Sequence, residues 1–367
     1  METTDLFVVG GGPAGLAAAL AARRKGLRVV VADPARPPID KACGEGLMPD
    51  ALAALGRLGV NLSIEDGAPF RGIRFLGYGS AVGARFSRGV GLGIRRTRLH
   101  EILVEQAQAA GVQLRWGTPV TAIRDGSVVA GDSRTAFRYL AGADGGNSNV
   151  RRWAGLDQSA RDGVRFGFRR HYRVEPWSNS VEVHWAPRCQ IYVTPVAADC
   201  VCVALLVRQQ DQRLDQALRL FPEVERRLAG ATAIGPERGG ASRFRRLHQV
   251  VKGNTALAGD ASGSVDAVTG EGLSLAFRQA VALADALACD RLEQYQQAHA
   301  RIRQGPDWMA SLLLLIDRSD WLCRRALRAL AGRPDVFSSM LAAHVGETSP
   351  ATFASALCLL GWSLLTV

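Results

Sequence analysis

A glycine-rich turn close to the N-terminus constrains the fold more than any other feature. The apolar run at residues 6–10 is typical of a buried strand of a parallel sheet, and an Ala- and Leu-rich helix is expected over 14–25. Between them stands the pattern Gly10-x-Gly12-x-x-Gly15. Gly10 permits the tight turn, Gly12 lets a pyrophosphate approach the backbone, and Gly15 allows helix and strand to pack closely. The spacing predicts a dinucleotide-binding turn.

A second strand completes this unit. Residues 27–32 are apolar except for Arg28, and Asp33 follows them, 18 residues after Gly15. A carboxylate at this strand end accepts hydrogen bonds from ribose hydroxyls and repels a 2′-phosphate. The first residues of the preceding helix, Ala14 among them, offer free N–H groups and a partial positive charge to phosphates. We therefore expect FAD or NAD, and not NADP, at this βαβ unit.

Two later segments favour FAD. Residues 140–151 carry an Asp-Gly motif at Asp144, and residues 255–263 carry a Gly-Asp motif at Gly259-Asp260. With the N-terminal turn, these motifs resemble the FAD-dependent oxidoreductases of the para-hydroxybenzoate hydroxylase type. The resemblance lies in the branch shared with geranylgeranyl reductases and flavin-dependent halogenases, and it covers most of residues 1–300.

The resemblance also implies contacts around the flavin. Gly270, Gly272 and Leu273 open a long helix whose positive N-terminus is expected at the flavin N1/C2=O edge, where it stabilises the anionic reduced flavin. Lys41, Cys43 and Gly44 resemble a Cys-Gly loop along the flavin ring, Arg96 resembles an arginine that reaches FAD, and Val120 resembles a strand end beside the adenine. In the family NAD(P)H docks only transiently, and this chain has no second glycine-rich motif after a strand.

The expected fold class is α/β. A Rossmann-like FAD-binding domain is predicted, with an inserted antiparallel β-sheet substrate domain and a helical C-terminal tail. The first part of the FAD-binding domain is expected over 1–160 with a β insertion near 68–92, the substrate sheet over 161–250, the second FAD-binding part over 251–300, and the helical region over 301–367.

The resemblance implies a monooxygenase. It would use NAD(P)H and a flavin C4a-hydroperoxide to hydroxylate an aromatic, polyketide-like or carrier- or protein-tethered substrate. The alternative is a flavin-dependent reductase of isoprenoid double bonds. In the segment typical of geranylgeranyl reductases, Tyr192 and Pro195 are present here, but the tryptophan and phenylalanine are absent, as is the halogenase Trp-x-Trp-x-Ile-Pro motif. A non-catalytic flavoprotein subunit is a further alternative.

No catalytic residue is assigned, because the flavin supplies the reactivity and the protein supplies orientation and electrostatics. Glu45, His184, Tyr192 and Pro195 are the candidates for the substrate pocket. Each also has a structural interpretation: Glu45 as a solvated loop carboxylate, His184 as a satisfied structural histidine, and Tyr192 as a core aromatic. Cys43 is either a reactive thiolate or a small residue that lets its loop pass the flavin. No metal site is expected.

Charge and cysteine content bear on partners and location. The formal net charge is +11, but the basic residues are scattered without a basic stripe interleaved with aromatics, so nucleic acid is not an expected partner. Seven cysteines without a CxxC pattern indicate a reducing, cytoplasmic setting. The apolar stretches at 308–316 and 351–367, with arginines between them, are interpreted as helices that cap the substrate pocket; the alternative is peripheral contact with a membrane.

Overall fold

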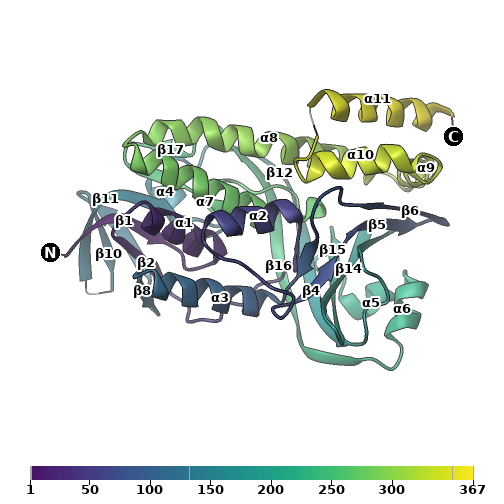
Figure 1. The fold of residues 1–367 in the computed structure, drawn as a ribbon, viewed down its shortest axis with the longest axis horizontal. Helices are drawn as coiled ribbons and strands as arrows, with labels where there is room; N and C mark the ends of the chain where they lie inside the picture. The colour runs from purple at the N-terminus through teal and green to yellow at the C-terminus, as the bar shows by residue number, and fades with distance from the viewer. Residues whose placement is uncertain (1, 132, 349, 367) are drawn as a thin grey trace.

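The molecule has two large sheets. One belongs to the expected nucleotide-binding part and the other to the expected substrate part. The structure is a computed structural model and describes residues 2–131, 133–348 and 350–366. Figure 1 shows the N-terminal sheet with its helices at one end, the second sheet at the other, and the helices of residues 320–366 above the second sheet.

The first sheet has the order β17-β18-β11-β1-β2-β8, with β1, β2, β8, β11 and β18 parallel and a β9–β10 hairpin attached to β11. Its strands are β1 (Glu2–Val9), β2 (Val29–Asp33), β8 (Gln113–Trp116), β9 (Val120–Arg124), β10 (Ser127–Ala130), β11 (Ser133–Gly142), β17 (Val251–Lys252) and β18 (Thr255–Leu257). The helices of this part are α1 (Pro13–Arg24), α3 (Arg96–Ala109), α4 (Asn149–Trp153) and α7 (Gly272–Ala288).

The core of this part follows from its sequence pattern. Continuous apolar runs, such as Phe7 and Val8 in β1, are fully buried in one core cluster that also holds side chains of α1, α3, α4, α7 and β10. Strands β8 and β9 lie on either side of a turn within residues 112–124. The chain turns at Gly117, whose φ of +67° suits glycine, so β8 and β9 join different edges of the sheet.

The second sheet has the order β16-β12-β15-β14-β13-β5-β6 and is antiparallel except where β13 pairs with β5. Its strands are β5 (Gly72–Gly77), β6 (Ser80–Arg85), β12 (Ser159–Arg173), β13 (Val181–Ala186), β14 (Cys189–Ala197), β15 (Cys200–Val207) and β16 (Thr232–Leu247). The insertion near 68–92 therefore adds two strands to this sheet. A small third sheet of β3 (Gly46–Leu47), β4 (Ala68–Phe70) and β7 (Gly91–Gly93) and helix α2 (Pro49–Arg57) lie between the two parts.

The second sheet has two differently covered faces. Short helices α5 (Leu214–Leu218) and α6 (Pro222–Leu228) pack on one face, against apolar side chains such as Ile191 and Val203. The other face contributes Val183 and Trp185 to a core shared with the C-terminal helices. These are α8 (Leu292–Ile316), α9 (Asp320–Gly332), α10 (Pro334–His344) and α11 (Pro350–Thr366). Among the described residues, none of the helices combines the length and apolarity needed to cross a bilayer.

Candidate functional site

The glycine-rich turn has the geometry that its spacing predicts. A Cβ on Gly10 would lie 2.4 Å from the carbonyl oxygen of Ala143, and one on Gly15 would lie 1.8 Å from that of Gly10. Both positions are closed to any side chain. Gly12 is the opposite case: no atom lies within 4 Å of a Cβ built on it, at the N-terminus of α1. The turn thus leaves open space beside free helix N–H groups, where a pyrophosphate fits.

Asp33 holds this turn from the end of β2. Its carboxylate accepts hydrogen bonds from the backbone N–H of Gly11 at 2.7 Å and of Ala35 at 2.8 Å. The backbone N–H of Thr118 donates to the carbonyl of Asp33 at 2.9 Å, which brings the chain just before Val120 to the same strand end. Asp33 and Val120, both predicted to meet the adenosine half of FAD, are therefore near each other.

A buried histidine that sequence reasoning missed supports the same turn. The Nδ1 atom of His100 accepts from the backbone N–H of Ile39 at 3.4 Å, so its Nε2–H donates to the carbonyl of Gly11 at 2.9 Å. Burial lowers the pKa of His100, which favours this neutral form. Only its place on the buried face of α3 could have indicated this role, because nothing in the local sequence links position 100 to Gly11.

The Asp-Gly and Gly-Asp motifs meet through a buried arginine. Arg151 donates from Nη1 to the carbonyl of Ala261 at 3.0 Å and from Nη2 to that of Gly146 at 2.8 Å. Asp144 is occupied locally: its carboxylate accepts from the Ser148 hydroxyl and from backbone N–H groups at the start of α4. The structure thus gives the Asp144 side chain a capping role that competes with its predicted contact to FAD.

The Gly-Asp motif lies directly against the glycine-rich turn. A Cβ on Gly259 would be 2.5 Å from the Cβ of Ala14, so the two segments touch although 245 residues separate them. Asp260 is exposed and lies 3.5 Å from the Nζ atom of Lys41. Residues 10–15, 33 and 259–260 therefore converge, as a single dinucleotide requires.

The residues on the side of the predicted flavin ring also fit FAD. Arg96 is buried, and its Nη1 atom has no hydrogen-bond partner in the described part of the protein. A buried guanidinium N–H without an acceptor is costly, and a phosphate or ribityl oxygen of FAD would satisfy it. Gly44, Gly270 and Gly272 also have open space where a Cβ would be. Leu273, next to Gly272, is half-buried against the core of the first sheet.

The loop after Cys43 directs the side chain of Glu45 into the interior of the protein. Glu45 has φ of +60° and a buried side chain, which excludes the solvated interpretation of this residue. Its carboxylate accepts from the backbone N–H of Arg96 at 2.9 Å and contacts His171 Nε2 at 2.6 Å. Arg169 donates to His171 Nδ1 at 3.2 Å and pairs with Asp40. This buried cluster joins the predicted flavin loop to the second sheet.

Glu45, His171 and Cys202 are close enough together to be considered as metal ligands. Their surroundings argue against it. A histidine that binds a metal normally donates its other ring N–H to an acceptor, but here a guanidinium faces Nδ1 of His171. Arg169 Nε is also only 3.6 Å from the Glu45 carboxylate, so a cation would be repelled. Burial raises the pKa values of Cys43 and Cys202, which favours the interpretation of Cys43 as a small, unreactive residue.

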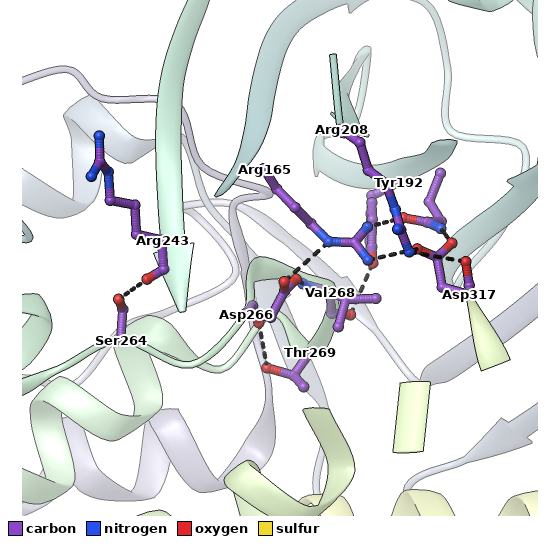
Figure 2. A network of polar contacts seen from close by, with 10 residues as sticks. Arg165, Tyr192, Arg208, Arg243, Ser264, Asp266, Val268, Thr269 and Asp317 are labelled. Atoms are coloured by element: carbon purple, nitrogen blue, oxygen red, sulfur yellow. Dashed lines mark hydrogen bonds and ion pairs between the residues drawn. The ribbon is translucent and has the colours of Figure 1, made fainter. Parts of the chain in front are cut away.

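Tyr192 points toward the loop that precedes α7. Its hydroxyl donates to the carbonyl of Val268 at 2.8 Å. Beside it, Arg165 of β12 forms ion pairs with Asp266 at 3.0 Å and with Asp317 at 2.6 Å (Figure 2). All three charged side chains are at least nine-tenths buried. The network links the second sheet, the loop before α7 and the end of α8.

Two of the predicted pocket residues, His184 and Pro195, lie on a different face of the second sheet from Tyr192. Alternation along the strands places His184 and Pro195 on the face of the sheet opposite Tyr192, because odd and even neighbours point to opposite sides. His184 contacts the Glu182 carboxylate at 3.1 Å, in line with a satisfied structural histidine. Pro195 lines an open cavity of about 580 Å³ with Trp177 and Arg74. Glu45 and Tyr192 remain on the side of the predicted flavin.

Comparisons with known proteins agree with this geometry. Residues 3–298 match the FAD binding domain family. The menaquinone reductase of Mycolicibacterium smegmatis is 28% identical over 82% of this chain and 80% of its own length. The para-nitrophenol 4-monooxygenase of a Pseudomonas strain is 29% identical over 78% of both chains. A flavoprotein/dehydrogenase from Cytophaga hutchinsonii has the same fold, with a TM-score of 0.80 at 18% identity over 93% of this chain and 92% of that one. The chain therefore belongs to the FAD binding domain family and is an FAD-dependent oxidoreductase.

Proposed function

We propose that this oxidoreductase is a monooxygenase that takes electrons from NAD(P)H and hydroxylates an aromatic, polyketide-like or carrier- or protein-tethered substrate. When bound, FAD supplies the hydride acceptance and the oxygen activation. The chain's own residues must then orient the substrate and keep water out of the site. The observation that carries the proposal is the buried ion-pair network of Arg165, Asp266 and Asp317, which we call the closure.

The closure joins three segments that are far apart in the sequence. Arg165 contributes from the second sheet, Asp266 from the loop before α7, and Asp317 from the end of α8. Gln190 and Arg208 also bind the Asp317 carboxylate. A monooxygenase needs such exclusion of water more than a reductase does, because its reactive oxygen is lost as hydrogen peroxide when water reaches the site.

The other residues of the site have binding and positioning roles in this proposal. Arg96 would donate from its unpartnered Nη1 to FAD, and the N-terminus of α7 would offer its N–H groups to the flavin ring edge. Tyr192 is fixed by its bond to Val268 and would form one wall of the substrate space. The similarity to para-nitrophenol 4-monooxygenase over most of both chains supports a ring substrate.

Reduction of an isoprenoid double bond is the second candidate. It is favoured by the similarity to the menaquinone reductase of M. smegmatis, which also extends over most of both chains. In that reaction the site must deliver a hydride and a proton to an apolar chain, and dioxygen plays no part.

Oxygen consumption separates the two candidates. The purified FAD-loaded protein is mixed with NADH or NADPH and panels of phenolic and prenyl substrates, in air and under argon. Substrate-dependent oxygen uptake with a hydroxylated product supports the proposal, whereas anaerobic substrate reduction by NAD(P)H overturns it in favour of the reductase. An Arg165→Met variant should release more hydrogen peroxide per NAD(P)H oxidised. Arg170→Met, on the opposite face of the same strand, is the matched control.

A further inference from the structure

The C-terminal helices expose large apolar side chains that the proposed reaction does not use. Three of the chain's seven tryptophans lie here with high exposure: Trp308 at 63%, Trp321 at 65% and Trp362 at 69%. Leu315 and Leu359 are also exposed, at 49% and 41%. Exposed aromatic and aliphatic side chains concentrated on neighbouring helices, rather than scattered singly over the molecule, indicate an interaction surface.

Helix α8 carries one outward stripe. Arg301, Trp308 and Leu315 are all exposed and follow one another at intervals of seven residues, so they share one face of the helix. The opposite face is buried, with Met309 and Leu313 in the core shared with the second sheet. The stripe therefore combines a cation with apolar groups on a face that no described part of the protein covers.

Helix α9 repeats this arrangement. Trp321, Arg324 and Arg328 are exposed at positions i, i+3 and i+7, whereas Ala326 and Leu327 are buried in the core. Arg325 connects this face to α11, because its guanidinium lies 5.2 Å from the centre of the Trp321 ring and donates to the carbonyl of Leu364. The exposed part of α9 thus borders the end of α11 that carries Trp362.

Most of the arginines within residues 301–333 have no acidic partner in the described part of the chain. Asp307, Asp317 and Asp335 are each paired with an arginine. In contrast, five arginines of this region have no carboxylate partner among the described residues: Arg301, Arg318, Arg324, Arg325 and Arg328. Tryptophan beside unpaired arginine fits an anionic bilayer surface, where the rings enter the headgroup region and the guanidinium groups meet phosphates.

We propose that α8, α9 and α11 form a surface that docks this protein onto an anionic lipid bilayer. The helices would lie on the bilayer without crossing it, in line with the absence of a membrane-spanning helix from the described residues. Docking would bring strands β5 and β6, on which α9 packs, near the lipid phase. This proposal is independent of which flavin reaction the enzyme performs.

Vesicle co-sedimentation of the FAD-loaded protein tests the surface. Vesicles of phosphatidylcholine alone are compared with vesicles that contain one third phosphatidylglycerol. We expect binding to the anionic vesicles, weak binding to the neutral ones, and release from the anionic vesicles in 1 M salt, where the Debye length falls to about 3 Å. No binding to anionic vesicles, or equal binding to both kinds, overturns the proposal.

Variants assign the binding to the named helices. Arg324→Gln/Arg328→Gln should lower the partition coefficient on anionic vesicles about 25-fold, since each interfacial arginine contributes about a factor of five. Arg324→Lys/Arg328→Lys should retain it. The matched control is Arg188→Gln/Arg219→Gln, which removes two exposed arginines, one in the turn between β13 and β14 and one directly after α5. Equal loss in the control shows a nonspecific effect of net charge and overturns the assignment.

Tryptophan variants complete the test. Trp308→Ala/Trp321→Ala should weaken vesicle binding, whereas Trp153→Ala, an exposed tryptophan of α4, should not. Flavin absorbance confirms that each variant is folded. A stable dimer in solution that Trp321→Ala dissociates would show that a second copy of the chain covers this face, and would overturn the lipid proposal.

Discussion

Replacement of Arg165 by methionine tests the closure of the site most directly. The change removes a guanidinium that lies 3.0 Å from Asp266 and 2.6 Å from Asp317, and methionine keeps much of its packing volume. Removal of one partner from a buried ion pair costs about 3–5 kcal/mol, because the other charge stays buried. Asp317 keeps Arg208 at 2.8 Å, so the loss falls mainly on Asp266, and we expect the low end, about 3 kcal/mol.

The pH dependence of that loss provides a second signature. Burial already raises the pKa of Asp266 in spite of Arg165. Without the guanidinium this pKa rises further, so the folded variant retains a proton that its unfolded chain has released. The free energy of unfolding of the variant therefore falls, relative to the parent, as pH increases through this range. The deficit should be smaller at pH 5 than at pH 8.

Equilibrium urea unfolding of the FAD-loaded proteins at both pH values measures the effect. Arg170→Met is the control on the same strand. Arg170 pairs with Asp215, whose side chain is 68% exposed, so its replacement should cost less than about 1 kcal/mol. A loss below about 1 kcal/mol for Arg165→Met, or a deficit that does not change with pH, would refute the role assigned to this arginine.

Three further changes have defined outcomes. Gly12→Val should leave a folded protein without the yellow colour of bound flavin, because the space beside it is open, whereas Gly15→Ala should reduce folded yield, because its Cβ would lie 1.8 Å from the Gly10 carbonyl. Arg96→Met should weaken FAD binding about 10- to 100-fold in fluorescence titration, because this is the contribution of one charge-assisted hydrogen bond to affinity. Unchanged affinity would show that Arg96 Nη1 does not contact FAD. Burial raises the pKa of Glu271 to about 7, so the stability of the protein should fall as pH rises from about 4.5 to 7. Thermal unfolding of the Glu271→Gln variant should lose this dependence of stability on pH. An unchanged dependence would point to another group.

The cofactor half of the site was predictable because it depends on the spacing of residues that are close together in the sequence. The roles of Gly10, Gly12 and Gly15 depend on a turn between neighbouring elements, and the structure gives each the close approach or open space expected. The substrate half was less predictable. His184 and Tyr192 lie on paired strands, and which face of a sheet meets the flavin depends on how the sheet packs against another part of the chain.

Long-range contacts account for most of what the sequence could not show. Arg165 meets Asp317 across 152 residues, and Glu45 meets His171 across 126. No local pattern predicts such pairs. The left-handed backbone at Glu45 also sends the side chain inward, against the usual tendency of a loop carboxylate to be solvated.

The parallel pairing of β13 with β5 has a consequence for any attempt to express the second sheet alone. Its strands come from residues 72–85 and 159–247, so a fragment cut at 161–250 would lose β5 and β6. Strand β13 would then become an exposed edge strand. Its unpaired backbone groups would lie next to the apolar side chains of Trp185 and Val183. Such an edge recruits other chains, and the fragment would aggregate instead of folding as an independent module.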